Sequence, residues 1–295
     1  MIPDEIIKKI KQVHIKSRRT VNTMLAGRYK SVFRGSGIEF EEVRDYSPGD
    51  DVKSIDWKVS ARLGKPFIKL YREERENVVM LLIDMSASLK FGTFAGLKLE
   101  KAAEIASVLA FSAIKNNDKA GAIFFTDRVE KYIPPKKGSA HVWRLIKEIF
   151  TFEPRGKKTD ISSALDYFAK VTKKSSLCFI ISDFLDRGNY IKNLKTAGHK
   201  HEIIGIMLSD KGEFKLPEKG IVTLSDFESP ENSITLDAYS KTTQKIYFDH
   251  KTKEYQDSLH RLSRAKSDVI EITTESSVAE SLSKYFIGKN RSKAV

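Results

Sequence analysis

Continuous apolar runs recur along the chain from Asn77 onward, separated by stretches with apolar residues at helical spacing. The runs are VVMLLID (78–84), AGAIFF (120–125), LCFIIS (177–182), EIIGIML (202–208) and DVIEIT (268–273). Such runs are typical of strands that are buried on both faces of a parallel sheet. The helical patterns lie near 98–116, 141–150, 161–174, 189–197, 240–265 and 278–286. This alternation predicts βαβ units with right-handed crossovers, and therefore a doubly wound, mostly parallel α/β sheet.

Two further segments follow a different pattern. The run VEKYIPP (129–135) follows the strand at 120–125 too closely for a helical crossover, so we expect it to pair as an antiparallel edge strand. Between about 215 and 238, the short runs IVTL and SITL are separated by a Ser-Pro turn. Short apolar runs around a turn are typical of a hairpin, so this stretch predicts a small β insertion.

The first 75 residues differ from the rest in their pattern of apolar and polar residues. Apolar residues among lysines and arginines predict a basic amphipathic helix over about 3–25, which we expect to dock on the main domain; a helix on a membrane surface is the alternative. From 28 to 75, glycines and prolines break the pattern, which predicts an irregular arm laid over the main domain. The sequence thus divides into 1–75, a main domain at 76–288 and a basic tail at 289–295.

Three loops of the predicted sheet carry hydroxyl and carboxylate side chains. Asp84, Ser86 and Ser88 come from DMSAS after the first strand, Thr159 comes from KKTD, and Asp183 follows LCFIIS. The loops after the carboxyl ends of parallel strands converge on one crevice, so these side chains can meet there. Magnesium and manganese take oxygen ligands and keep some positions for water or an external carboxylate. The sequence therefore predicts a Mg²⁺ or Mn²⁺ site at these residues.

Aspartate and serine after a strand also occur as simple helix caps, so DMSAS alone is a weak signal. The metal interpretation gains its force from Thr159 and Asp183, which lie at the matching ends of later segments. Asp160 directly precedes the helical pattern at 161–174, so we interpret it as the N-cap of that helix and not as a ligand.

The order D-x-S-x-S, then T, then D resembles the metal-ion-dependent adhesion site of von Willebrand factor A domains. The segment GSGIEFEEVRDYSPGDDVKSIDWKVSARLGKPFIKLYREE (35–74), with DMSASLKFG, FEPRGKKTDISSAL and IISDF, is similar to the MoxR-associated family, the domain of unknown function numbered fifty-eight. The resemblance covers almost the whole chain and implies a von Willebrand factor A-like fold with the metal at the positions above. Many relatives have hydrophobic spans ahead of the signature, and this sequence has none there.

Proteins of this family are typically encoded beside AAA+ ATPases of the MoxR type and are associated with maturing or remodelling other protein complexes. The resemblance implies a non-enzymatic, metal-dependent protein-binding module, with a MoxR-type AAA+ ATPase and an acidic client protein as partners. The signature gathers opposite charges and an indole in Arg44, Asp50, Asp51, Asp56, Trp57 and Arg62. We interpret these residues as a structural clamp of buried, paired charges, with a contact surface for the ATPase as the alternative.

The formal charge of +13 is the unusual bulk property, and nine lysines and arginines lie in the first 35 residues. Such a charge favours nucleic acid, anionic membrane surfaces or acidic proteins as partners. Because no nucleic-acid-binding motif is present, binding to nucleic acid or to an anionic membrane surface is kept only as the alternative function. No apolar run reaches the roughly 20 residues needed to cross a bilayer, and the start has no signal-peptide core. The sequence therefore predicts a cytoplasmic protein.

The sequence lacks the motifs of the common enzyme classes. Ser86 stands where a haloacid-dehalogenase-like phosphotransferase needs its second Asp as general acid. The sequence has no G-x-S-x-G nucleophile elbow, no metalloprotease spacing among its six His and no phosphate-binding G-x-x-x-x-G-K-[ST] loop. The only cysteine, Cys178, lies in an apolar run, which favours a buried thiol over a nucleophile. We therefore expect no catalytic turnover.

Overall fold

The computed structural model describes residues 4–22, 39–72, 77–93, 95–186, 188–228 and 231–293. By its internal contacts the chain forms two compact units, one of residues 1–32 with 77–295 and one of residues 33–76. We call the larger unit the body and the smaller unit the arm. The stretch of the predicted arm before Glu39, including Arg28, Lys30 and Arg34, lies outside the described residues, and so do 73–76.

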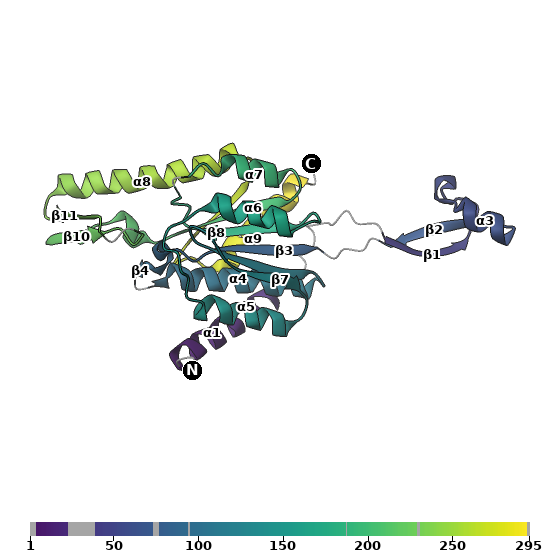
Figure 1. The fold of residues 1–295 in the computed structure, drawn as a ribbon, viewed down its shortest axis with the longest axis horizontal. Coiled ribbons are helices and arrows are strands. Elements are labelled where there is room, and N and C mark those ends of the chain that lie inside the picture. The colour runs from purple at the N-terminus through teal and green to yellow at the C-terminus, as the bar shows by residue number, and fades with distance from the viewer. Residues whose placement is uncertain are drawn as a thin grey trace. The chain divides into compact units, whose positions relative to one another are not determined.

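The body is built on a sheet of parallel strands with one antiparallel edge strand. In spatial order these strands are β12 (Asp268–Thr273), β9 (Glu202–Ser209), β8 (Leu177–Ser182), β3 (Val78–Asp84), β6 (Lys119–Phe125) and β7 (Val129–Lys136). β3 pairs in parallel with β6 on one side and β8 on the other, and β7 pairs antiparallel with β6. This order confirms the doubly wound, von Willebrand factor A-like fold predicted from the sequence (Figure 1).

Helices cover both faces of the sheet, which explains why the strands read as unbroken apolar runs. One face carries α6 (Ile161–Val171), α7 (Ile191–Gly198) and α8 (Lys241–Arg264), and the other carries α4 (Lys98–Lys115), α5 (Ser139–Thr151) and α9 (Val278–Lys293) (Figure 1). Cys178 is fully buried in β8, and burial raises the pKa of its thiol. Across the residues that the structure describes, no helix combines the length and the apolar character that a bilayer span requires.

The N-terminal helix α1 (Asp4–Thr20) packs on the body, as the sequence predicts, but it belongs to the body and not to a segment 1–75. Its apolar stripe, with Ile10 buried, lies against α4 and α5, and Lys9 donates to Glu100 of α4 over 2.7 Å. The interpretation of residues 289–295 as a basic tail also differs from the structure, because α9 continues to Lys293. Lys289 of this helix pairs with Glu202 over 3.0 Å and with Asp268 of β12, so the helix keeps contact with the sheet beyond the predicted end.

Short elements join the larger ones at the end of the sheet where the candidate site lies. They are the 3-10 helix η3 (Ala87–Lys90), the hairpin β4 (Gly92–Thr93) and β5 (Gly96–Leu97), the 3-10 helix η4 (Lys211–Phe214), and the hairpin β10 (Ile221–Ser225) and β11 (Ser233–Asp237). The last hairpin is the β insertion predicted at 215–238, and its strands pair with each other in a sheet of their own.

The arm contains more regular structure than its glycines and prolines indicate. β1 (Glu39–Asp45) pairs antiparallel with β2 (Phe67–Arg72), and the connection between them holds the 3-10 helix η2 (Val52–Ser54) and α3 (Trp57–Leu63). α3 ends at Gly64, whose φ of 74° lies in the left-handed region that glycine adopts without strain. The glycines and prolines therefore mark the ends of short helices and strands and do not prevent these from forming.

Candidate metal site at the end of the sheet

The order of the strands brings two aspartates together. Asp84 ends β3, and Asp183 directly follows β8, which is the neighbour of β3 in the sheet. From β3 the chain moves to β6 on one side and later to β8 on the other, so this is the point where the strand order reverses. Ligands of open α/β sheets bind at such points, at the carboxyl ends of the strands. Both side chains are nearly excluded from solvent, with Asp84 0% and Asp183 3% exposed.

Asp84 is held by short hydrogen bonds on both carboxylate oxygens. Oδ1 accepts from the backbone N–H of Ser86 over 2.8 Å, and Oδ2 accepts from the hydroxyl of Ser182 over 2.6 Å. Burial, and then the charge of Asp183, raise the pKa of Asp84 to about 7. Because the two buried carboxylates lie at the ends of neighbouring strands, a cation that approached them would be stabilised there.

The two serines of DMSAS point their hydroxyls at each other. Ser86 Oγ and Ser88 Oγ lie 3.0 Å apart, and both side chains are buried. Two neighbouring oxygens of an octahedral magnesium ion, each at about 2.1 Å from it, are separated by about 3 Å. The serine pair therefore has the spacing of two ligands of one small, hard cation.

Thr159 reaches the site through a partner that the sequence does not indicate. Its Oγ1 donates to Oε1 of Glu228 over 2.8 Å, and the charge of Asp183 is among the causes that raise the pKa of Glu228, after burial. The loop that carries Thr159 is fixed to the first loop, because Ala87 N–H donates to the carbonyl of Lys157 over 2.9 Å. The backbone thus links the loop of Thr159 to the loop of Ser86 and Ser88, and the hydroxyl of Thr159 itself is engaged by Glu228.

Asp160 caps α6, as the sequence predicts. Its Oδ1 accepts from the backbone N–H of Ser163 over 3.0 Å. The same loop contains Gly156, where a β-carbon would lie 2.1 Å from Oδ1 of Asp127 and 2.2 Å from Oγ1 of Thr126. Glycine is therefore required here by the close approach of neighbouring side chains, and this fixes the path of the chain toward Thr159.

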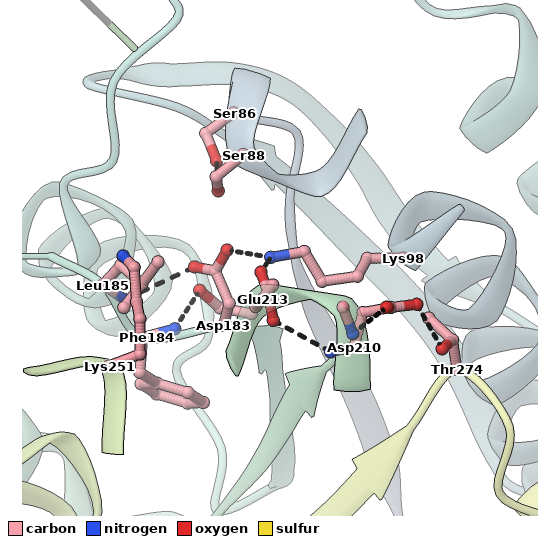
Figure 2. Close-up of polar contacts among 12 residues, drawn as sticks. Ser86, Ser88, Lys98, Asp183, Phe184, Leu185, Asp210, Glu213, Lys251 and Thr274 are labelled. Carbon is pink, nitrogen blue, oxygen red and sulfur yellow. Dashed lines mark hydrogen bonds and ion pairs between the residues drawn. The ribbon is translucent and has the colours of Figure 1, made fainter. Parts of the chain in front are cut away.

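Asp183 is paired with a buried lysine. Nζ of Lys98 lies 2.7 Å from Asp183 Oδ2 and 2.5 Å from Glu213 Oε1, and Lys98 is 1% exposed (Figure 2). Burial alone would lower the pKa of Lys98, but the charges of Asp183 and Glu213 outweigh it and raise that pKa. The figure shows this ammonium between the two carboxylates, with the hydroxyls of Ser86 and Ser88 facing the same space.

The backbone after Asp183 has an unfavourable conformation. Phe184 has a φ of 56°, in the left-handed region that bulky residues rarely adopt, and it is fully buried. Its N–H donates to the hydroxyl of Ser182 over 3.0 Å. Strained residues that the surroundings hold in place gather at functional sites, so this loop is a further mark of the site.

The residues present fit a magnesium or manganese ion. Ser86 and Ser88 offer neutral oxygens at the right spacing, and Thr159 offers a third hydroxyl. The oxygens of Asp84 and Asp183 are engaged by Ser182, Lys98 and backbone N–H groups, so their charges would act on the ion through water or from the second shell of ligands. Among the described residues, no cluster of three or more His, Cys, Asp or Glu side chains forms a metal site. The candidate ligands are therefore mainly hydroxyls.

Sequence reasoning missed four side chains of this site. They are Ser182, Lys98, Glu213 and Glu228. Ser182 stands directly before Asp183 at the end of β8, so its position was a usable signal, and its hydroxyl donates to Asp84 at the end of the neighbouring strand. The other three come from the start of α4, from η4 and from the loop after β10, and only the folded chain brings them to the site.

The comparisons with known proteins identify a family. The model described as "Protein of unknown function DUF58" matches residues 42–273. An uncharacterised protein of Mycobacterium tuberculosis (strain H37Rv), Rv1480, is 30% identical over 222 residues, covering 75% of this chain and 70% of the relative. The uncharacterised protein YeaD of Bacillus subtilis (strain 168) is 26% identical over 107 residues, covering 36% of this chain and 25% of the relative.

Solved structures show weaker similarity. The conserved hypothetical protein BatB of Bacteroides thetaiotaomicron is 16% identical, covers 73% of this chain and 99% of its own, and superposes with a TM-score of 0.45. The SpRpn10 VWA domain is 11% identical, covers 70% of this chain and 94% of its own, and has a TM-score of 0.38. The function is therefore argued from the residues of the site.

Proposed function

The chain belongs to the DUF58 family, and we propose that it is a metal-dependent protein-binding module that holds a carboxylate of its partner. The observation that carries the proposal is the pair of serine hydroxyls 3.0 Å apart, beside two buried carboxylates at the reversal point of the sheet. Such a site suits the binding of a ligand, and the carboxylates beside it are engaged by Ser182, Lys98 and backbone N–H groups, so we propose binding without turnover.

The charge balance of the site explains why an external carboxylate would bind. The three hydroxyl ligands are neutral, and Lys98, which lies between Asp183 and Glu213, offsets part of the negative charge of these two carboxylates. An ion held mainly by neutral oxygens keeps most of its positive charge and has coordination positions filled by water. A Glu or Asp side chain of a partner can replace one water and gain a charge-assisted contact.

The contacts of Asp183 offer a route from the site to the helices. Lys98 begins α4, and the carbonyl of Glu213 accepts from the hydroxyl of Tyr247 in α8 over 3.0 Å. A carboxylate that entered the site would change the field at Asp183, and Lys98 and Glu213 lie in direct contact with it. We propose that binding is felt at the starts of α4 and α8 through these contacts.

The proposed partners follow from the family resemblance and from charge. A MoxR-type AAA+ ATPase and an acidic client protein both fit a site that holds carboxylates, and the excess positive charge would speed their encounter. Nucleic acid gains less support from the structure, because part of the basic N-terminal cluster is used within the body. Lys9 and Lys16 pair with Glu100 and Glu104 of α4.

The test compares binding of a purified MoxR-type AAA+ ATPase, or its acidic client, under three conditions. These are the wild type with Mg²⁺, the wild type with a chelator, and Ser86→Ala/Ser88→Ala with Mg²⁺. We expect binding in the first condition and its loss in the other two. The matched control is Ser107→Ala/Ser112→Ala, which removes two buried hydroxyls that donate to carbonyls within α4 and lie outside the site. Equal binding in all conditions would remove the metal from the function.

A further inference from the structure

The β10–β11 hairpin has little packing surface of its own. Its strands pair only with each other among the described residues, and most of their side chains are exposed, with Ile221 77% and Ile234 58% exposed. An isolated two-stranded hairpin is at best marginally stable in water. The position of this hairpin must therefore depend on what its ends contact.

The residues after β10 contact two loops of the metal site. The ring of Phe227 meets the ring of Phe91 edge to face, with centroids 6.0 Å apart, and Phe91 lies three residues after Ser88. Glu228 then accepts the hydrogen bond from Thr159, and its own N–H donates to Oδ1 of Asp226 over 2.9 Å. The hairpin thus touches the loop after β3 and the loop before α6.

The carboxylate of Glu228 lies next to a predicted ligand of the metal. Its side chain is half-buried, and its Oε1 accepts from the hydroxyl of Thr159 over 2.8 Å. Within the described part of the chain, no lysine or arginine forms an ion pair with it. A half-buried carboxylate is stabilised by a nearby cation, and the metal proposed above would supply that charge.

We propose that Glu228 is a tethered carboxylate that occupies the position of the partner's carboxylate, so that the hairpin closes the site until a partner displaces it. This inference rests on the proposed function. The tether gives Glu228 an effective concentration on the order of millimolar, so a partner must compete with it. Displacement would free the hairpin and expose the side of Phe227 that packs on Phe91, which a partner could then contact. The partner's segment therefore combines a carboxylate with an apolar side chain next to it.

The test uses Mn²⁺ as the probe and Glu228→Gln as the variant. The glutamine keeps an oxygen that can accept from Thr159 and removes only the charge. The matched control is Glu231→Gln, an exposed glutamate on the other side of the hairpin tip. Water proton relaxation reports how many waters exchange on the bound Mn²⁺, and titration gives its affinity. We expect Glu228→Gln to bind Mn²⁺ about tenfold more weakly and to add about one exchanging water, with Glu231→Gln like the wild type.

The outcomes separate this inference from the proposed function. If the wild type binds Mn²⁺ and Glu228→Gln matches it in affinity and in bound water, the tethered carboxylate is wrong and the metal site stands. If the wild type binds no Mn²⁺, the proposed function fails and the inference fails with it. Hydrogen exchange adds a second readout, because Mn²⁺ should slow exchange of the β10 and β11 amides in the wild type and leave Glu228→Gln unchanged.

Discussion

Ion pairs between a basic side chain and a carboxylate occur in two different surroundings in this protein, one open to solvent and one buried. In the arm, Arg44 makes two hydrogen bonds of 2.7 and 2.9 Å to Asp50, and the pair is open to solvent, with the side chain of Arg44 42% and that of Asp50 19% exposed. In the body, Lys98 contacts Asp183 and Glu213, and the side chains of Lys98 and Asp183 are only 1% and 3% exposed. Exposed pairs contribute little to stability because water screens them, whereas breaking a buried pair leaves a charge without compensation.

The comparison corrects part of the interpretation of the signature. The predicted pairing is present, since Arg44 pairs with Asp50 and Asp56 with Lys69. The predicted burial is not, because Arg62 and Trp57 are exposed, with Trp57 at 69%. Asp56 is also the N-cap of α3. Its Oδ1 accepts from the N–H groups of Lys58 and Val59 over 3.0 and 3.2 Å. The arm is therefore held by caps and local bonds. The buried charges lie at the sheet end, in residues that the signature does not contain.

The largest effect should come from Lys98→Met, which breaks the buried pair of the body. We expect a loss of about 3–5 kcal/mol in the free energy of unfolding, because Asp183 and Glu213 lose their compensating charge. Chemical denaturation measures it, with Lys16→Met as the control, since Lys16 is 65% exposed in its pair with Glu104. Mg²⁺ should restore part of the loss in Lys98→Met. If Lys98→Met lost no more free energy of unfolding than Lys16→Met, the buried pair would contribute no more to stability than an exposed pair.

A smaller effect is expected from Gly156→Ala, which alters the loop that carries Thr159. The added methyl group would collide with Asp127 and Thr126, so we expect a loss of about 1–3 kcal/mol together with weaker Mn²⁺ binding. Gly198→Ala is the matched control, because a β-carbon there meets nothing within 4 Å. Denaturation and Mn²⁺ titration of both variants provide the measurement. If Gly156→Ala kept full affinity for Mn²⁺, the path of this loop would not matter to the site.

The smallest effects should come from the arm. Asp56→Ala should lower the melting temperature slightly, because α3 loses its cap, and Arg44→Ala should lower it less, because its pair with Asp50 is exposed. Differential scanning calorimetry compares both with the wild type. If either arm variant lowered stability as much as Lys98→Met does, the interpretation of the arm as a structural clamp would be supported. Full stability with loss of a partner would support the contact surface for the ATPase.

The sequence predicts the fold well because each strand and helix has a local pattern of apolar residues. The runs at 78–84 and 177–182 are buried strands, and the residues that follow them, Asp84 and Asp183, are adjacent once the strands pair. Ser86 and Ser88 meet because both belong to one short loop. Lys98, Glu213 and Glu228 could not be predicted, because no local pattern marks a lysine or glutamate whose partner lies 69 to 115 positions away.

The central claim is that the hydroxyls of the sheet-end loops hold a divalent cation. Calorimetric titration of the purified protein with Mn²⁺ tests it most directly, with Ser86→Ala/Ser88→Ala as the variant and Ser107→Ala/Ser112→Ala as the control that removes two buried serines elsewhere. We predict about one bound ion in the wild type and in the control, and its loss in the variant, while circular dichroism shows the sheet intact in all three. Equal Mn²⁺ affinity in the wild type and in Ser86→Ala/Ser88→Ala would contradict the claim.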